Sequence, residues 1–190
     1  MLLKLWKKKD VKLDIFKKLI AKGSIVRAIP APKTSSKPRS FFDGYNNWAK
    51  EEGGKGLGYI VLNKEKDKII GTGPIAKFFS EQALDEIIKI CNLKESDSVF
   101  FSCDIKKNAE KISGLARQKL GHELNLIDRN KFEFCWIIDF PMYQYNEEEK
   151  KIDFSHNPFS MPQGDPRDFE KSDPLSVLAY QYDLVCNGYE

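Results

Sequence analysis

Several features that would assign this chain to a special class of protein are scarce or absent. It contains four cysteines among 190 residues, and they stand singly, without the CxxC pairs of zinc sites or the dense spacing of secreted disulfide proteins. The opening MLLKLW is too short for the apolar region of a signal peptide, and no run approaches the roughly 20 apolar residues of a membrane helix. These absences predict reduced thiols, a cytoplasmic location and no membrane partner.

A strong excess of charge of one sign is also missing. The chain carries 31 basic and 28 acidic residues, a formal net charge of +3. Net charge therefore favours neither a nucleic-acid protein nor a membrane-surface protein. Lysines do gather in KLWKKKDVKLDIFKK, residues 4–18, but a solvated helix end explains them at least as well as a nucleic-acid contact does.

Residues 10–128 alternate helical and strand patterns, which predicts a compact α+β domain. Apolar residues recur at helical spacing from about 11 to 22, where Gly23 offers a left-handed stop. Three further helices are expected behind the capping residues Ser40, Ser80 and Asp104, the last two ending near Asn92 and Gly121. The expected strands are SIVRAI, LGYIVL, KII and SVFFSC, of which the middle two form a hairpin and the last is fully buried.

The pattern changes near Lys131, and residues 131–190 predict a second domain. FEFCWIIDF is typical of a long strand, NEEEKK of a polar turn and IDF of a returning strand. The Pro- and Gly-punctuated stretch SHNPFSMPQGDPRDFEKSDP then predicts a loop of about twenty residues. Loops of that length in compact domains are usually functional or disordered, and a functional loop is favoured here.

Few residues of this second part suggest chemistry by themselves. His156 lies in the long loop, where ligand-binding groups are often presented, whereas His122 follows a helix end and suggests a capping role. Asp139 closes an apolar strand. A buried carboxylate needs partners, so a structural hydrogen bond is favoured over contact with a substrate.

Asp183 and Glu190 are two carboxylates seven positions apart in YDLVCNGYE. On a regular strand they would face opposite sides of the sheet. A bulge at Gly188 would add one residue to the strand, shift the alternation of side chains and place both carboxylates on one face. Two carboxylates on one face could hold Mg²⁺ against substrate phosphates. Carboxylates on an exposed edge strand are the alternative, and the residues alone leave it open.

Two blocks of this sequence, in this order, resemble bacterial-type aspartyl-tRNA synthetases of class II. VRAIPAP, KGLGYIVL, GPIAKFF and VFFSCDIKKNAEKISGLARQKLG are similar to their GAD insertion domain. FEFCWIIDFPMYQYNEEEKKIDFSHNPFSMP and AYQYDLVCNGYE are similar to the part of the catalytic domain that precedes the third class II signature. GAD-type domains also occur in one of the subunits of tRNA-dependent amidotransferases, but the second block has no counterpart expected there.

The resemblance implies a GAD-like insertion domain over residues 10–128 and part of a class II antiparallel catalytic sheet over residues 131–190. It implies that His156 contacts the substrate aspartate, that Glu190 binds ATP and its Mg²⁺, and that Asp183 is the companion metal ligand. The implied partners of the full-length enzyme are tRNA-Asp, L-aspartate, ATP and a second copy in a homodimer. Asn157 stands where many family members have a second histidine, and relatives with this variant often charge tRNA-Asn as well.

The resemblance also leads us to expect that this chain is a fragment, inactive alone. The anticodon-binding domain of the OB type and the three class II signatures have no match in it. The alternative is a free-standing GAD-type module that binds tRNA or a protein.

Overall fold

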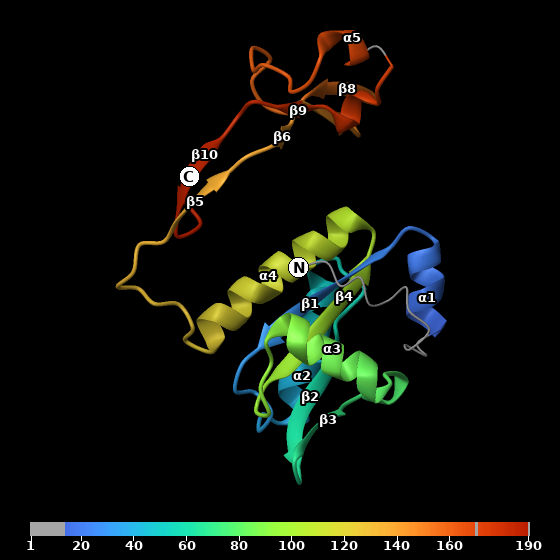
Figure 1. The fold of residues 1–190 in the computed structure, drawn as a ribbon, viewed down its shortest axis with the longest axis vertical. Helices are drawn as coiled ribbons and strands as arrows, with labels where there is room; N and C mark the ends of the chain where they lie inside the picture. Colours follow the sequence, from blue (N-terminus) through green and yellow to red (C-terminus); the bar gives the residue numbers. More distant parts are fainter. Residues whose placement is uncertain (1–13, 170, 190) are drawn as a thin grey trace. The chain divides into compact units, whose positions relative to one another are not determined.

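The computed structural model describes residues 14–169 and 171–189. The chain divides into two compact units, unit 1 ending at Ile127 and unit 2 beginning at Asp128, and both combine helices with antiparallel strands (Figure 1). The α+β class predicted from the sequence is therefore confirmed.

Unit 1 is built around a four-stranded antiparallel sheet with the strand order β1-β4-β2-β3. Its elements are α1 (Asp14–Ala21), β1 (Ile25–Ala31), α2 (Arg39–Glu51), β2 (Gly58–Glu65), β3 (Lys68–Thr72), the 3-10 turn η2 (Ala76–Phe78), α3 (Glu81–Cys91), β4 (Ser98–Asp104) and α4 (Lys106–Glu123). The start of the first helix predicted near residue 11 lies outside the described residues.

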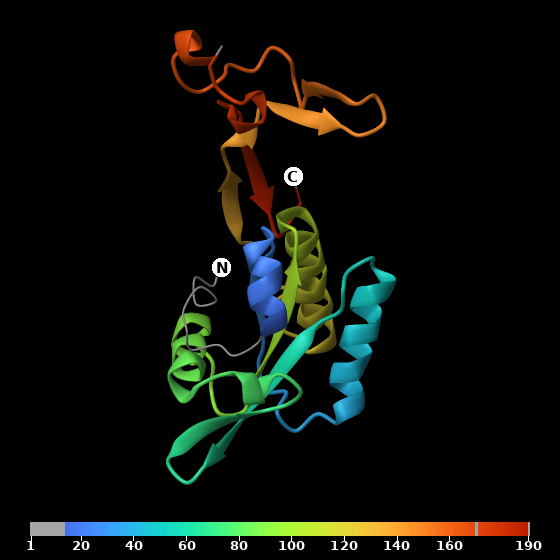
Figure 2. The same ribbon diagram turned by 90° about the vertical axis from the view of Figure 1, so that its right-hand side faces the viewer.

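Strand β4 lies inside the sheet, and all seven of its residues are buried. Successive side chains of a strand point to opposite faces, so Phe100 and Phe101 belong to different cores. Phe101 lies with Ile87 of α3 in the first core, against which α1 also packs. Phe100 lies with Phe42 of α2 and Ile112 of α4 in the second. The sheet thus has helices on both faces (Figure 2).

Several local predictions for unit 1 are confirmed. The Ser80 hydroxyl accepts a hydrogen bond from the Ala83 backbone N–H at 3.2 Å, and α3 ends at Asn92 in the left-handed region with φ 51°. Strands β2 and β3 form the expected antiparallel hairpin. Their turn is shorter than NKEKD, because pairing continues to Glu65 opposite Lys68.

The prediction that Asp104 caps the helix after it is wrong. The residue before α4 is Ile105, which provides no side-chain cap, while Asp104 is the last residue of β4. Its carboxylate accepts a hydrogen bond from Lys55 Nζ at 2.7 Å and another from the Ile105 backbone N–H at 2.8 Å. Burial acts to raise the pKa of Asp104, but these donors outweigh it and hold the pKa below its usual value. The helix also continues past Gly121 to Glu123.

Two other boundaries differ from the predictions in unit 1. Strand β1 continues through Pro30 to Ala31, although the prolines suggested a loop. The strand tolerates Pro30 because β1 is an edge strand, where a missing N–H can face away from the sheet. Helix α2 begins at Arg39 after Pro38, so Ser40 is a helical residue and not the cap.

Unit 2 consists of short strands and turns. Its elements are β5 (Phe134–Ile137), β6 (Phe140–Pro141), β7 (Tyr143–Asn146), β8 (Lys151–Phe154), α5 (Pro166–Phe169), the 3-10 turn η3 (Pro174–Ser176), β9 (Leu178–Ala179) and β10 (Asp183–Cys186). They form three two-stranded pairs, β5 with β10, β6 with β9 and β7 with β8. The buried core of its described residues is Met142, Val177 and Ala179, far smaller than either core of unit 1.

The predicted long strand FEFCWIIDF is broken. Asp139 has a left-handed φ of 59°, which no strand residue adopts, so β5 ends before it and β6 begins after it. The polar turn NEEEKK is present, with the Asn146 side chain accepting hydrogen bonds from the Glu148 and Glu149 backbone N–H groups. The strand returning from that turn pairs with β7, however, and β5 pairs with β10 at the other end of the unit.

The two-sided burial of β4 leads to a test of stability. Replacing Phe100, which is 0% exposed, with alanine should lower the free energy of unfolding of unit 1 by about 3 to 5 kcal/mol. The matched variant Ile105→Ala removes a side chain of unit 1 that is 53% exposed and should change it by about 0.5 kcal/mol or less. Urea unfolding followed by far-ultraviolet circular dichroism measures both. Equal losses would show that Phe100 does not hold the core.

Candidate functional site

The loop that carries His156 is fixed by backbone hydrogen bonds to Met142, between β6 and β7, and to the chain at β9. At its start, the Ser155 N–H donates to the Met142 carbonyl at 3.0 Å. Near its middle, Gln163 N–H donates to the Leu178 carbonyl and Tyr180 N–H to the Met161 carbonyl, each at 2.7 Å. Strand β9 is consequently bordered by β6 on one side and by residues 161–163 on the other. The long loop is therefore ordered by the strands it returns to.

His156 is exposed and stands against the ring of Phe140 from β6. The two ring centroids are 5.0 Å apart, with an angle of 87° between the ring planes. Such an edge-to-face contact orients the imidazole through its ring system. Neither ring nitrogen is used in a hydrogen bond within the described residues, so both are available to a ligand.

Asp139 is exposed, not buried as its place after an apolar strand suggested. Its carboxylate accepts a hydrogen bond from Gln163 Nε2 at 3.0 Å, and the same amide donates to the Ala179 carbonyl at 2.9 Å. The contact agrees with the structural role favoured for Asp139. Gln163 was not singled out from the sequence, and its only signal was its place in the turn-forming PQGD.

Asn187 and Gly188 form a tight turn that reverses the chain. Cys186 and Tyr189 exchange two backbone hydrogen bonds of 2.8 and 2.9 Å across it, and the two turn residues have φ 50° and 87°. Positive φ at both positions is typical of the type I′ hairpin turn, for which Asn-Gly is the preferred pair. Gly188 therefore lies in a turn, and the predicted bulge in a continuous strand is wrong.

Asn187 also holds the start of β5, a role not foreseen from the sequence. Its side-chain oxygen accepts a hydrogen bond from the Glu133 N–H, and its amide donates to the Lys131 carbonyl, both at 2.9 Å. The Asn187 backbone N–H donates to the Glu133 carbonyl as well. The turn and the entry to unit 2 are thus fixed together.

Asp183 is half-buried at the first position of β10, opposite Ile137 of β5. It makes no ion pair within the described residues, so its carboxylate is free to accept a ligand. Glu190 lies outside the described residues, and its pairing with Asp183 stays a prediction. Across residues 14–169 and 171–189, no three His, Cys, Asp or Glu side chains are grouped so that they could hold a metal ion by themselves. Mg²⁺ often takes one or two carboxylates together with substrate phosphates, and Asp183 fits that requirement.

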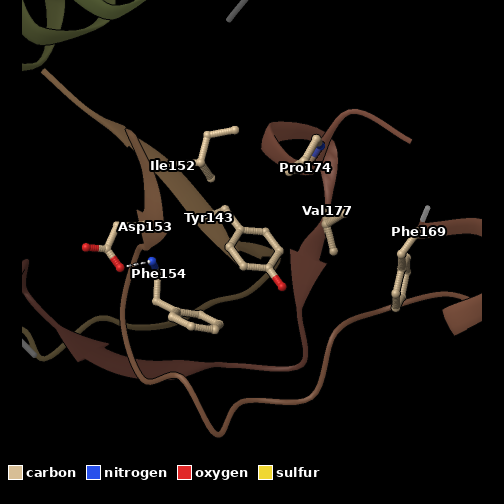
Figure 3. Close-up of a pocket in the computed structure, with 7 residues that line it drawn as sticks. All are labelled: Tyr143, Ile152, Asp153, Phe154, Phe169, Pro174 and Val177. Carbon is tan, nitrogen blue, oxygen red and sulfur yellow. Dashed lines mark hydrogen bonds between the residues drawn. The ribbon is translucent and has the colours of Figure 1, made fainter. Parts of the chain in front are cut away.

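A cavity of about 340 Å³ opens elsewhere in unit 2, next to the hairpin of β7 and β8 (Figure 3). The rings of Tyr143 and Phe154 lie 5.2 Å apart beside it. Asp153, the charged side chain there, accepts a hydrogen bond from the Phe154 N–H. The remaining lining residues are Ile152, Phe169, Pro174 and Val177. Because neither His156 nor Asp183 lines this apolar cavity, we do not assign it to the candidate site.

The ribbon of β5 and β10 exposes apolar side chains on an unusual scale. Trp136 is 60% exposed and contacts the ring of Tyr182, itself 67% exposed. The other exposed apolar side chains of these two strands are Phe134, Ile137 and Leu184. Exposed apolar patches of this kind are typical of surfaces that pack against further protein. Within the described residues, no helix combines the length and apolar character needed to cross a membrane.

Comparisons with known proteins match both units. The family model described as "GAD domain" matches residues 16–113. Three curated proteins named "Aspartate--tRNA(Asp/Asn) ligase" match nearly the whole chain. The protein of Beijerinckia indica is 51% identical over 98% of the chain, that of Pelagibacter ubique 53% over 95%, and that of Wolbachia pipientis 55% over 96%. The chain spans about 30% of the length of these relatives, 31%, 30% and 30% in turn.

The GAD match covers more than half of the chain and follows unit 1 from α1 into α4. The identity to the ligases continues beyond it, through the strands and the His156 loop of unit 2. The chain belongs to the GAD domain family and is about 50% identical, along nearly its whole length, to aspartate–tRNA(Asp/Asn) ligases.

Proposed function

We propose that this chain is part of an aspartate–tRNA ligase that activates aspartate with ATP and transfers it to tRNA-Asp, and to tRNA-Asn as well. The observation that carries the proposal is the identity of 51 to 55% that extends across both units. A binding domain shared among unrelated proteins would account for the match to unit 1 alone. We assign residues 10–128 to the GAD-like insertion domain and residues 131–190 to part of the catalytic domain.

In the proposed reaction, a carboxylate oxygen of aspartate attacks the α-phosphorus of ATP and pyrophosphate leaves. Catalysis of such a step rests on positioning and on neutralising the phosphate charge. We propose that His156 contacts aspartate, because its ring is oriented by Phe140 while its nitrogens are available. Asp183 and Glu190 would hold the Mg²⁺ that accompanies ATP, which supplies the neutralising charge. The full-length enzyme would act as a homodimer.

A binding module built on unit 1 is the second candidate function. It is favoured by the two cores that unit 1 possesses by itself, compared with three buried apolar side chains among the described residues of unit 2. We expect the 190-residue chain alone to show no aspartate-dependent exchange of ATP with pyrophosphate, because it spans about 30% of the length of the ligases it resembles and lacks half of the ATP contacts that the resemblance implies. Measurable exchange by the purified chain would refute this expectation, and tRNA binding without exchange would support the module.

The role of His156 is tested in a full-length enzyme. His156→Ala should raise the KM for aspartate about tenfold or more, because losing a hydrogen bond to a charged group costs about 1.5 kcal/mol or more. The KM for ATP should change much less. His122→Ala, which removes the other histidine of the chain from α4, is the control and should leave both constants unchanged. An unaltered aspartate KM in His156→Ala would remove His156 from the site.

The metal assignment is tested by the Mg²⁺ dependence of pyrophosphate exchange in the same enzyme. Glu190→Gln keeps the shape of the side chain and removes its charge, so it should lower the rate and raise the Mg²⁺ concentration needed for half-maximal exchange. Asp183→Asn should act in the same direction but less strongly, as expected for a contact through a metal-bound water. Asp153→Asn removes a carboxylate of β8 and serves as the control. If Glu190→Gln leaves the rate and the Mg²⁺ requirement intact, the metal role is wrong.

A further inference from the structure

A groove of about 440 Å³ runs along the outer side of β1 in unit 1. Strand β1 is at the edge of the sheet, so no strand among the described residues covers it there. Residues 27–30 of β1 line the groove together with the C-terminal end of α3 and the middle of α4. A volume of this size lies within the range of small-molecule sites. The groove is distant in sequence from every residue assigned above to aspartate or ATP.

Arg27 lines this groove with a hydrogen-bonding group that has no acceptor. Its side chain is only 12% exposed, and one guanidinium nitrogen, Nη2, donates to Glu110 of α4. The other, Nη1, is buried and finds no partner within the described residues. Buried polar side-chain atoms are nearly always hydrogen-bonded in folded proteins, and those of a charged group cost most when unpaired. Nη1 has no accessible surface in this structure, so an oxygen from outside the chain would satisfy it only after the guanidinium turns toward the groove.

The charge of the groove favours an anion. Arg117 of α4 is a second guanidinium in the lining, exposed and without an ion pair in the described part of the chain. Glu110 is the one carboxylate there, and Arg27 already engages it. Guanidinium groups bind carboxylate and phosphate oxygens with matched geometry. Pro30 and Ile90 add apolar surface to the same groove.

Gly114 leaves space on the wall formed by α4. It stands within an 18-residue helix, where glycine is unfavourable relative to alanine. A Cβ added at Gly114 would meet no atom within 4 Å, so packing inside unit 1 does not require the glycine. Its effect is to keep the groove open beside Arg117.

We propose that this groove binds a small organic anion, whose carboxylate or phosphate-ester oxygens pair with the exposed Arg117 and with Nη1 of Arg27, whose guanidinium turns into the groove on binding. The apolar part of the anion lies against Pro30 and Ile90. The site belongs to unit 1 and is independent of the proposed ligase reaction.

The test is a titration of the isotope-labelled 190-residue chain, followed by ¹H–¹⁵N NMR, with phenyl phosphate, phenylacetate and the neutral 2-phenylethanol. Saturable shifts of the Ala28, Gly114 and Arg117 amides with either anion are expected, and the anion that binds more tightly identifies the preferred oxygen group. Binding of the neutral alcohol with equal affinity, or the absence of saturable shifts, would overturn the proposal.

Variants separate binding from folding. Arg117→Gln should weaken anion binding about fivefold to tenfold, while Arg39→Gln, which removes the same charge from an exposed position on α2, should stay within twofold. Glu110→Gln should tighten binding, because it frees Arg27 from its internal partner.

Gly114→Leu should abolish binding by filling the groove, and it should raise the melting temperature, because leucine is the better helix former. Retained binding in Gly114→Leu, or equal losses in Arg117→Gln and Arg39→Gln, would contradict the proposed site.

Discussion

The burial of one strand, β4, determines the arrangement of unit 1. A strand buried on both faces needs a complete apolar layer on each side. Phe100 and Phe101 are consecutive, and each contributes its ring to the layer on one side. The helices then divide between the faces, α2 and α4 on one and α1 and α3 on the other. Since β1 and β2 both pair with β4, the edge position of β1 and the groove beside it follow from the same constraint.

Unit 2 is organised differently, by backbone hydrogen bonds and turns more than by apolar burial. Its short strands are fixed by paired residues at their ends, as where Asn187 holds the start of β5, and its described core consists of three side chains. The aromatic residues of β5 and β10 remain exposed. Such a unit leaves apolar surface free to pack against further protein, in keeping with the catalytic-sheet role proposed for it above.

The sequence predicted the local signals of unit 1 well, because each depends on neighbouring residues. Examples of such local signals are the Ser80 cap, the left-handed Asn92 and the β2–β3 hairpin. The Asp104 prediction failed because Lys55, far away in the sequence, takes its carboxylate. An acidic side chain before a helix is compatible with both outcomes, and nothing local distinguishes them.

In unit 2 the exposed histidine loop was correctly expected, but the strand pairing was not. The break at Asp139 depends on a left-handed backbone that no local pattern indicated, and the partner of β5 lies at the opposite end of the unit. The prediction at Gly188 assumed a single strand, although Asn-Gly is also the strongest signal for a hairpin turn.

The pairing of the first strand of unit 2 with its last described strand also bears on how the protein is made. Synthesis proceeds from the N-terminus, and domains generally fold as they emerge. Unit 1 has every partner it needs once α4 has left the ribosome, whereas β5 waits until β10 has been translated. During that interval the apolar residues of β5 have no partner strand among the described residues, and they are a segment of the nascent chain that a chaperone would shield.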